Sequence, residues 1–431
     1  MEEKPSFREA LRFWVKLGLI SFGGPAGQIA IMHRELVERK RWIGEERFLH
    51  ALNFCMVLPG PEATQLATYC GWLLHGVRGG LAAGILFVLP GALALWALSW
   101  IYVSYGAVPA VAGIFYGLKA AVLAIVLAAV LRVGRKALKT PVAWGIAAAA
   151  FLALAVGRVP FPVVVLGALA AGFFGGKLWP EAFGVKTPGG AEVTTEMKAG
   201  GDQTALGTTR STGRIAAVGV VLWAAPVAAA VWWQGWDGLY AQLGIFFSKA
   251  AVVTFGGAYA VLPYVGQQAV ENYGWVTAPQ MLHGLALAET TPGPLILVLQ
   301  YVGFLAGWAQ PGGLSPLGAA TLGAAMTTWV TFVPTYLFIL VGAPYVERLR
   351  GKVRLSAALA AVTAAVVGVI LNLALWFGWH AVWPAGWTGG ADWWVAGGSV
   401  VAFAALQWGK VGLGWVVLGA AVAGWGWAAL G

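Results

Sequence analysis

Charged residues are scarce in this sequence, and their scarcity excludes a soluble fold. Lys, Arg, Asp and Glu make up 10% of the 431 residues, whereas soluble domains carry about 25%. Cysteine and histidine are rarer still, with 2 and 5 residues and no metal-ligand spacing among them. The motifs GxSxG, HExxH and the P-loop are absent. We therefore predict no metal site, no cofactor and no enzyme activity, and the chain offers no support for an ATP-driven pump.

Long apolar runs dominate the chain instead. Hydrophobic residues make up 59% of it, and runs close to the roughly 20 residues that cross a bilayer recur throughout. This pattern predicts an all-α polytopic membrane protein. The net charge of +10 lies in short segments between the runs, which favours orientation in a lipid bilayer over nucleic-acid binding. The apolar segments lie at about 11–32, 48–75, 80–103, 108–131, 141–157, 160–179, 215–234, 239–265, 281–309, 314–343, 355–379, 393–407 and 411–430.

One hydrophilic stretch divides the chain near its middle. Residues 180–214 are rich in Gly, Thr and charged residues, a composition typical of a flexible aqueous linker. We therefore predict a first membrane domain at 1–179, the linker at 180–214, an additional helix at 215–234 and a second membrane domain at 235–431.

The two membrane domains repeat one pattern. Residues 13–61 align without a gap to residues 246–294, and 14 of these 49 positions are identical. Chance would not reproduce the same glycine and proline positions, so the two halves are expected to share one structure. The matched elements are Lys16 with Lys249, Phe22-Gly23-Gly24 with Phe255-Gly256-Gly257, Trp42 with Trp275, His50 with His283, and Pro59-Gly60-Pro61 with Pro292-Gly293-Pro294.

This doubled pattern of FGG, then W, then PGP on both sides of a central linker resembles the two-domain chromate ion transporter family. The resemblance covers both halves of the chain. It implies a transporter that moves chromate, and by similarity sulfate, across the bacterial inner membrane.

The placement of Lys and Arg predicts that the two halves are inverted relative to each other. Residues 33–47 contain five Lys or Arg residues, whereas the matching residues 266–280 contain none. By the positive-inside rule the first loop is cytoplasmic and the second is external. A single additional crossing at 215–234 turns the second repeat over, as in many secondary transporters. We therefore expect two inverted-topology repeats, with the N-terminus and the central linker in the cytoplasm.

The motif-bearing segments 11–32 and 48–75 have two interpretations. Each spans the membrane, or each breaks at its Gly/Pro motif and returns to its own side. Re-entrant hairpins would place the N-terminus, residues 33–47 and the basic runs 132–139 and 348–354 on the same side. Alternatively, residues 33–47 form an amphipathic surface helix.

Four backbone interruptions, two in each half, predict a central anion site. Non-helical backbone is costly in lipid unless it lines a cavity or is buried in protein. Paired glycines let the chain unwind, and a following proline suits the start of a new half-helix. Each start carries unpaired N–H groups and about half a positive charge, which favours a tetrahedral dianion. The residues assigned to this site are Phe22, Gly23, Gly24, Pro25, Pro59, Gly60, Pro61, Phe255, Gly256, Gly257, Pro292, Gly293 and Pro294.

Polar side chains beside the interruptions are further candidate ligands. Lys16 and Lys249 stand within apolar segments, where an ionisable residue is a functional candidate; alternatively, each reaches the nearby interface from its helix end. Ser21 and Thr254 can donate to an oxyanion or to their own helix backbone. Three more candidates lie next to the Pro-Gly-Pro motifs, namely Thr64, Gln65 and Thr291.

Two acids stand next to the Pro-Gly-Pro motifs and do not match each other across the repeat. Glu62 follows the first motif directly, and Glu289 precedes the second. A carboxylate inside the membrane can carry a coupling proton. Alternatively, Glu62 caps the helix that begins there and has no role in transport.

The predicted function is secondary transport of divalent oxyanions, with chromate efflux as the leading interpretation, in exchange for sulfate or with protons. Such efflux would confer chromate resistance. An alternative is uptake of sulfate or a related oxyanion, and a second alternative is a membrane protein that transports nothing. The expected location is the bacterial inner membrane. A homodimer is one assembly that the sequence leaves open.

Overall fold

A computed structural model describes residues 5–22, 24–56, 58–184, 209–343 and 353–430, and the regular elements among them are all helical. The fold class predicted from the sequence, an all-α polytopic membrane protein, is confirmed. Gly23, most of the predicted linker and part of the predicted basic run at 348–354 lie outside the described residues.

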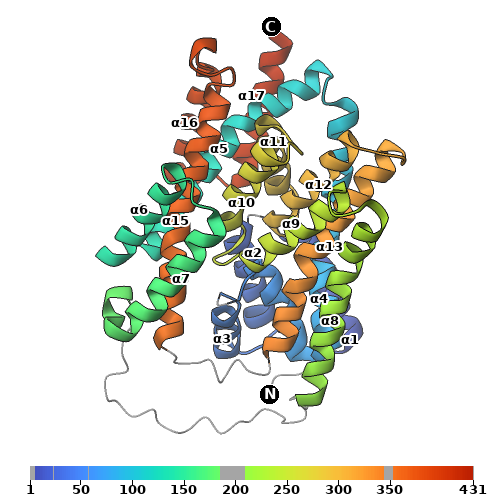
Figure 1. Cartoon of the computed structure of the whole chain (residues 1–431), viewed down its shortest axis with the longest axis vertical. Coiled ribbons are helices and arrows are strands. Elements are labelled where there is room, and N and C mark those ends of the chain that lie inside the picture. The colour runs from blue at the N-terminus through green and yellow to red at the C-terminus, as the bar shows by residue number, and fades with distance from the viewer. Residues whose placement is uncertain (1–4, 23, 57, 185–208, 344–352, 431) are drawn as a thin grey trace.

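Figure 1 shows the helices. In chain order the α-helices and two π-helices are α1 (Phe7–Ile20), α2 (Gly24–His33), η1 (Arg34–Arg39), α3 (Glu45–Cys55), α4 (Glu62–Tyr105), α5 (Pro109–Ala137), α6 (Pro141–Ala155), α7 (Phe161–Leu178), α8 (Thr209–Gln234), α9 (Leu239–Val252), α10 (Ala258–Gln267), η4 (Gln268–Asn272), α11 (Ala278–Thr290), α12 (Val298–Ala309), α13 (Pro316–Gly342), α15 (Val353–Val382), α16 (Trp393–Gln407) and α17 (Leu413–Leu430).

Seven of the described helices are long and apolar enough to cross a membrane. Four further apolar helices are shorter, at 10–17 residues. Several segments predicted as single runs are divided in the structure, because the Gly/Pro motifs interrupt them. The chain is therefore a multi-pass membrane protein in which short broken helices accompany full-length ones.

The same succession of helices occurs twice. The series α1, α2, η1 and α3 corresponds to α9, α10, η4 and α11. Helix α4 corresponds to a short 3-10 turn (η5, Leu295–Leu297) followed by α12 and α13, and α5–α7 correspond to α15–α17. Helix α8 has no counterpart among the described helices of the first half. The gapless alignment of 49 residues is thus one part of a longer structural repeat.

The helices stop at all four Gly/Pro motifs, as the sequence predicted. The breaks fall between Ile20 and Gly24, between Cys55 and Glu62, between Val252 and Ala258, and between Thr290 and Leu295. Glycines in the breaks adopt positive φ, a conformation that other residues rarely adopt. The prolines differ from expectation by one residue: Pro61 and Pro294 cap the next helix instead of starting it, and Pro25 is the second residue of α2. The glycines with positive φ at the breaks are Gly24, Gly60, Gly256, Gly257 and Gly293.

Helix α4 joins two segments that the sequence analysis separated. Its helical assignment runs from Glu62 to Tyr105 across a kink, where His75 and Gly76 have non-helical dihedral angles. Gly76 has a positive φ of 60°, which explains why the chain bends here. The kink corresponds to the loop between α12 and α13 in the second half.

The two halves exchange helices. Helices α6 and α7 of the first half pack on α15 of the second, and α16 and α17 of the second half pack on α5 of the first. Helices α4 and α13 also contact each other across the halves. In Figure 1, α3 lies in the lower part of the view and α11 in the upper part, with α2 and α10 near the middle between them. Each half therefore contributes helices to the packing of the other.

Equivalent aromatic pairs hold each broken segment to its first helix. Phe13 of α1 contacts Trp42 edge to face, with 5.4 Å between ring centroids. The matched residues Phe246 and Trp275 make the same kind of contact at 5.5 Å. Both tryptophans are buried. Their repetition in the sequence therefore reflects packing.

Candidate functional site

The four backbone breaks meet in two cross-half pairs. The Gly60 N–H donates to the carbonyl oxygen of Thr254 at 2.7 Å, and the Gly293 N–H donates to that of Ser21 at 2.8 Å. Gly60 and Gly293 are matched residues, and so are Ser21 and Thr254. We call these the Gly60–Thr254 junction and the Ser21–Gly293 junction. Each satisfies a carbonyl at the end of one broken helix with an amide from the other half.

Each Pro-Gly-Pro break lies against a long helix of the other half of the chain. A Cβ atom on Gly91 of α4 would overlap the Pro292 carbonyl oxygen, so α4 approaches the second-half break as closely as glycine allows. The first-half break, which matches the break at Pro292, lies close to α13 in turn. A Cβ on Gly60 would lie 3.1 Å from the Thr335 hydroxyl of α13. Gly91 follows Pro90 and Thr335 follows Pro334 within their helices. The same packing is thus built twice.

The Gly60–Thr254 junction brings two helix N-termini and one carboxylate together. Helix α4 begins at Glu62 after Pro61, and α10 begins at Ala258 after Gly257; no side chain caps either start. The Glu62 Oε1 atom lies 3.5 Å from the position of a Cβ on Gly257. The carboxylate of one helix start therefore stands at the start of the other. A helix N-terminus attracts negative charge, so this is the place an anion would be stabilised.

Two further polar residues lie on the first turn of α4. Thr64 is fully buried, and its hydroxyl has no hydrogen-bond partner among the described residues. The Gln65 amide nitrogen donates to the Pro59 carbonyl at 2.8 Å, which leaves its buried amide oxygen without a partner. Buried polar atoms without partners are rare in folded proteins. The Thr64 hydroxyl is therefore a buried donor without a partner among the described residues.

The Ser21–Gly293 junction is less polar. The residues that match Glu62, Thr64 and Gln65 are Leu295, Leu297 and Val298, all of them buried. Its polar side chain is Gln28 of α2, whose amide nitrogen donates to the carbonyls of Ser21 at 3.2 Å and Gly293 at 2.5 Å. Gln28 thus ties the junction together from within the protein.

A buried pair connects the elements of the two junctions. The hydroxyl of Tyr259, in the first turn of α10, donates to the Glu289 carboxylate near the end of α11. Both side chains are buried. The matched residues in the first half are Ala26 and Met56, so this pair exists once. Glu289 therefore has a protein partner.

The candidate lysines lie on the surface of the protein. Lys16 is 59% exposed, and its Nζ atom lies 3.9 Å from Glu35, which also accepts from Arg39 at 2.7 Å. Lys249 is exposed on α9. Glu35 matches Gln268 in the second half, so the ion pair of Lys16 is not repeated. The structure thus places Lys16 at the basic loop after α2.

The other candidate side chains bond their own helices or flank the breaks. The Ser21 hydroxyl donates to the Leu17 carbonyl and the Thr254 hydroxyl to the Ala250 carbonyl, both at 2.6 Å. The Thr291 hydroxyl donates to Ala288 at 3.2 Å. These hydroxyls can only accept from other groups. Of the remaining candidates, Phe22 is exposed; Phe255, Pro25, Pro59, Gly256 and Pro292 are half-buried; Gly24, Gly60, Pro61, Gly257, Gly293 and Pro294 are buried.

Sequence reasoning missed Gln28 and Tyr259. Gln28 follows Gly24 by four residues, as Gln65 follows Pro61 by four, and this shared spacing from a helix start is a signal that was available. Tyr259 offered no such signal, because its matched residue is Ala26. Among the described residues, no group of three His, Cys, Asp or Glu is placed to hold a metal ion.

Broken helices that meet in pairs at the interface of two structural repeats define a membrane protein of the transporter class. Comparison with known proteins is consistent with that class. The family model described as chromate transporter matches residues 8–173 and 241–425. The chain belongs to the chromate transporter family.

Three curated relatives resemble the chain over most of its length. The chromate transport protein of Pseudomonas aeruginosa is 37% identical over 82% of this chain and 77% of its own length. The chromate transport protein of Cupriavidus metallidurans is 29% identical over 80% of this chain and 75% of its own. The probable chromate transport protein of Synechococcus elongatus is 28% identical over 80% and 77%. No solved structure matches the chain significantly.

Proposed function

We propose that this protein is a secondary transporter of divalent oxyanions that carries chromate out of the bacterial cytoplasm. Its relatives are named for chromate transport, and this supports the substrate. The chain contains no ATPase motif, so the energy is supplied by an ion gradient. Sulfate, a dianion of the same shape, is the proposed exchange partner.

The Gly60–Thr254 junction is the proposed binding site. The observation that carries this proposal is the position of the Glu62 carboxylate between the starts of α4 and α10. A carboxylate is itself an oxyanion, and two uncapped helix starts favour it for the same reason that they favour chromate. The Thr64 hydroxyl adds a donor that has no partner among the residues that the structure describes.

Glu62 and the substrate therefore compete for one site. When Glu62 takes up a proton or turns away, the two helix starts are left without a negative charge and can bind the dianion. Return of the Glu62 carboxylate then expels it. This cycle links anion movement to a proton, which a membrane-embedded acid can carry. Glu289 is a second candidate proton carrier, and its bond to Tyr259 would have to break for it to act.

We propose that the two halves have inverted topology, so that the site can face each side of the membrane during the cycle. The repeated order of helices, the unmatched α8 and the excess of Lys and Arg in residues 33–47 over 266–280 support it. With this orientation the N-terminus and the linker are cytoplasmic. The exposed Lys16 and Lys249 stand one helix turn or more from the breaks and line the approach to them.

Flux measurements on the purified protein test the proposal. Reconstituted into liposomes, it should move radiolabelled chromate, and sulfate on the opposite side should accelerate the movement. Thr64→Val should raise the KM for chromate about 10-fold, since a hydrogen bond to a charged group contributes about 1.5 kcal/mol. The thermal stability should stay unchanged, because the hydroxyl has no partner to lose.

Thr68→Val is the matched control for this change. Thr68 lies one turn further along α4, is equally buried, and donates to the Thr64 carbonyl at 2.8 Å. The Thr68→Val variant should lower the thermal stability, because this hydrogen bond is lost, and should leave the KM for chromate unchanged. Chromate flux no greater than that of empty liposomes would contradict the proposed function.

A further inference from the structure

A cavity of about 480 Å³ has no junction residue in its lining and carries a concentration of positive charge. Its wall includes Arg132, Arg135 and Lys136 near the end of α5, together with Gln407 at the end of α16. No acidic residue lines it. The cavity forms where α5 of the first half meets α16 and α17 of the second, a contact made by the exchange of helices.

The three cations place like charges on the wall of one cavity. None of them forms an ion pair among the described residues. Three like charges around one cavity repel each other unless an anion is present. The volume is sufficient for an oxyanion with several hydration waters, each of which occupies about 30 Å³. The composition of the wall thus favours a multiply charged oxyanion.

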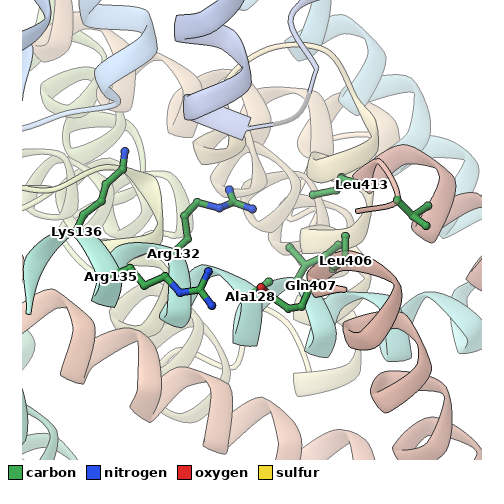
Figure 2. Close-up of a pocket in the computed structure, with 9 residues that line it drawn as sticks. Ala128, Arg132, Arg135, Lys136, Leu406, Gln407 and Leu413 are labelled. Atoms are coloured by element: carbon green, nitrogen blue, oxygen red, sulfur yellow. The ribbon is translucent and has the colours of Figure 1, made fainter. Parts of the chain in front are cut away.

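Two of the cations also face the acids of the central region. Figure 2 shows that Arg132 and Lys136 extend to one side of α5, whereas Arg135 extends to the other. Residues four apart share a helix face, which accounts for this arrangement. Lys136 interacts electrostatically with Glu62, and Arg132 does so with Tyr259 and Glu289. Arg132 and Lys136 therefore act electrostatically both on the cavity that they line and on the acids beside the breaks.

We infer that this cavity is an entrance site for the transported oxyanion. The inference rests on the proposed function and adds a second, outer binding site to it. Arg132, Arg135 and Lys136 concentrate dianions from solution, and the face that carries Arg132 and Lys136 then passes them toward the start of α4. The run of basic residues that contains them is predicted to be cytoplasmic, so the entrance serves anions that leave the cell.

Protection of an introduced cysteine tests occupancy of the cavity without relying on transport. Gln407→Cys is made in a chain whose buried natural cysteines are replaced, Cys55→Ala and Cys70→Ala. Labelling of the purified protein by a neutral maleimide is followed in detergent. Sulfate and molybdate are the probes, because they are tetrahedral dianions that do not oxidise thiols; chloride at equal ionic strength is the control. We expect the dianions to slow labelling at least 5-fold and chloride to have no effect.

Charge removal shows whether the basic residues cause the protection. Arg132→Gln with Lys136→Gln should abolish it and raise the KM for chromate about 10-fold, the order expected for partly screened charges. Lys139→Gln removes a charge just beyond the end of α5 and outside the cavity lining, and it should leave both the protection and the KM unchanged. Labelling that dianions do not affect, in a protein that still transports chromate, would overturn the entrance site alone.

An anionic lipid is the other source of the same chemistry. Labelling is repeated in liposomes of phosphatidylcholine, with and without phosphatidylglycerol. The entrance site requires protection by free dianions in phosphatidylcholine alone. Protection by phosphatidylglycerol without protection by sulfate or molybdate would assign the cavity to a lipid headgroup and overturn the inference.

Discussion

The two junctions share one backbone and differ in their chemistry. Each is closed by a glycine N–H that donates to a carbonyl of the other half, at 2.7 and 2.8 Å. The Gly60–Thr254 junction adds a carboxylate, an unpartnered hydroxyl and an amide from Glu62, Thr64 and Gln65. The Ser21–Gly293 junction has leucine, leucine and valine at the matched positions. Both junctions thus carry a glutamine, Gln65 in one and Gln28 in the other, and the Gly60–Thr254 junction alone of the two adds the Glu62 carboxylate and the Thr64 hydroxyl.

This difference indicates that the matched backbone contacts serve folding, whereas the unmatched side chains serve transport. Backbone hydrogen bonds and close helix contacts are repeated because both halves need them for packing. The carboxylate of Glu62 and the hydroxyl of Thr64 are not repeated, since Leu295 and Leu297 stand at the matched positions. The account predicts that changes to the shared backbone damage the fold, whereas changes to unmatched side chains alter transport.

The largest expected effect comes from filling the contact between α4 and the second-half break. Gly91→Leu places a side chain where the Pro292 carbonyl stands. Since backbone cannot move aside cheaply, we expect a loss of about 3 kcal/mol or more in stability and little protein in the membrane. Gly145→Leu on α6 is the control, because a Cβ there meets nothing within 4 Å. Equal expression and thermal stability of the two variants would contradict the close packing.

Removing the unmatched carboxylate should change transport more than stability. Glu62→Gln keeps the shape of the side chain and cannot exchange a proton. We expect chromate flux driven by a pH gradient to fall at least 10-fold, while binding of chromate at zero gradient becomes tighter because no carboxylate competes. Both are measured in proteoliposomes. A Glu62→Gln protein that still responds to the pH gradient would remove this residue from coupling.

The matched glycines Gly24 and Gly257 should respond unequally to valine. Both have positive φ, 69° and 89°, so each substitution strains the backbone by about 1–3 kcal/mol. A Cβ on Gly24 meets nothing within 4 Å, whereas one on Gly257 lies 3.5 Å from the Glu62 carboxylate. Gly257→Val should therefore reduce flux more than Gly24→Val at similar thermal stability. Equal flux in the two variants would show that the junctions are functionally alike.

The lysines should matter for transport and little for stability. The Lys16 side chain is exposed, so its ion pair with Glu35 contributes little to stability. Lys16→Ala should therefore lower the free energy of unfolding by no more than about 0.5 kcal/mol. If both lysines line the approach, Lys16→Ala and Lys249→Ala each lower chromate tolerance of cells. Lys177→Ala on α7 controls for loss of one positive charge. Normal tolerance in both lysine variants would leave them without a role in the mechanism.

Single cysteines test inversion with the smallest disturbance. Arg39 and Asn272 are matched and exposed positions, so Arg39→Cys and Asn272→Cys should leave activity unchanged. An impermeant thiol reagent should label them from opposite sides of the membrane. Labelling of both from the same side would show that the repeats are parallel.

Local signals in the sequence predicted the breaks. Contacts between residues far apart in the sequence could not be predicted from such signals. Paired glycines and Pro-Gly-Pro end helices by their own backbone preferences, so the positions of all four breaks followed from residues within each motif. The pairing of Gly60 with Thr254 depends on how two halves fold together, and no local pattern encodes it. The Tyr259–Glu289 bond and the contact of Gly91 with Pro292 escaped prediction for the same reason. The continuity of α4 across His75 was missed because charged and glycine residues there resemble a loop.

The most direct test of the account is the position of bound chromate. Anomalous diffraction from crystals of the protein grown with chromate would locate the chromium atom without reference to any mechanism. The account predicts a peak within hydrogen-bonding range of the amides that begin α4 and α10 and of the Thr64 hydroxyl, with the Glu62 carboxylate displaced. A peak at the Ser21–Gly293 junction, or no ordered chromate near either pair of breaks, would contradict it.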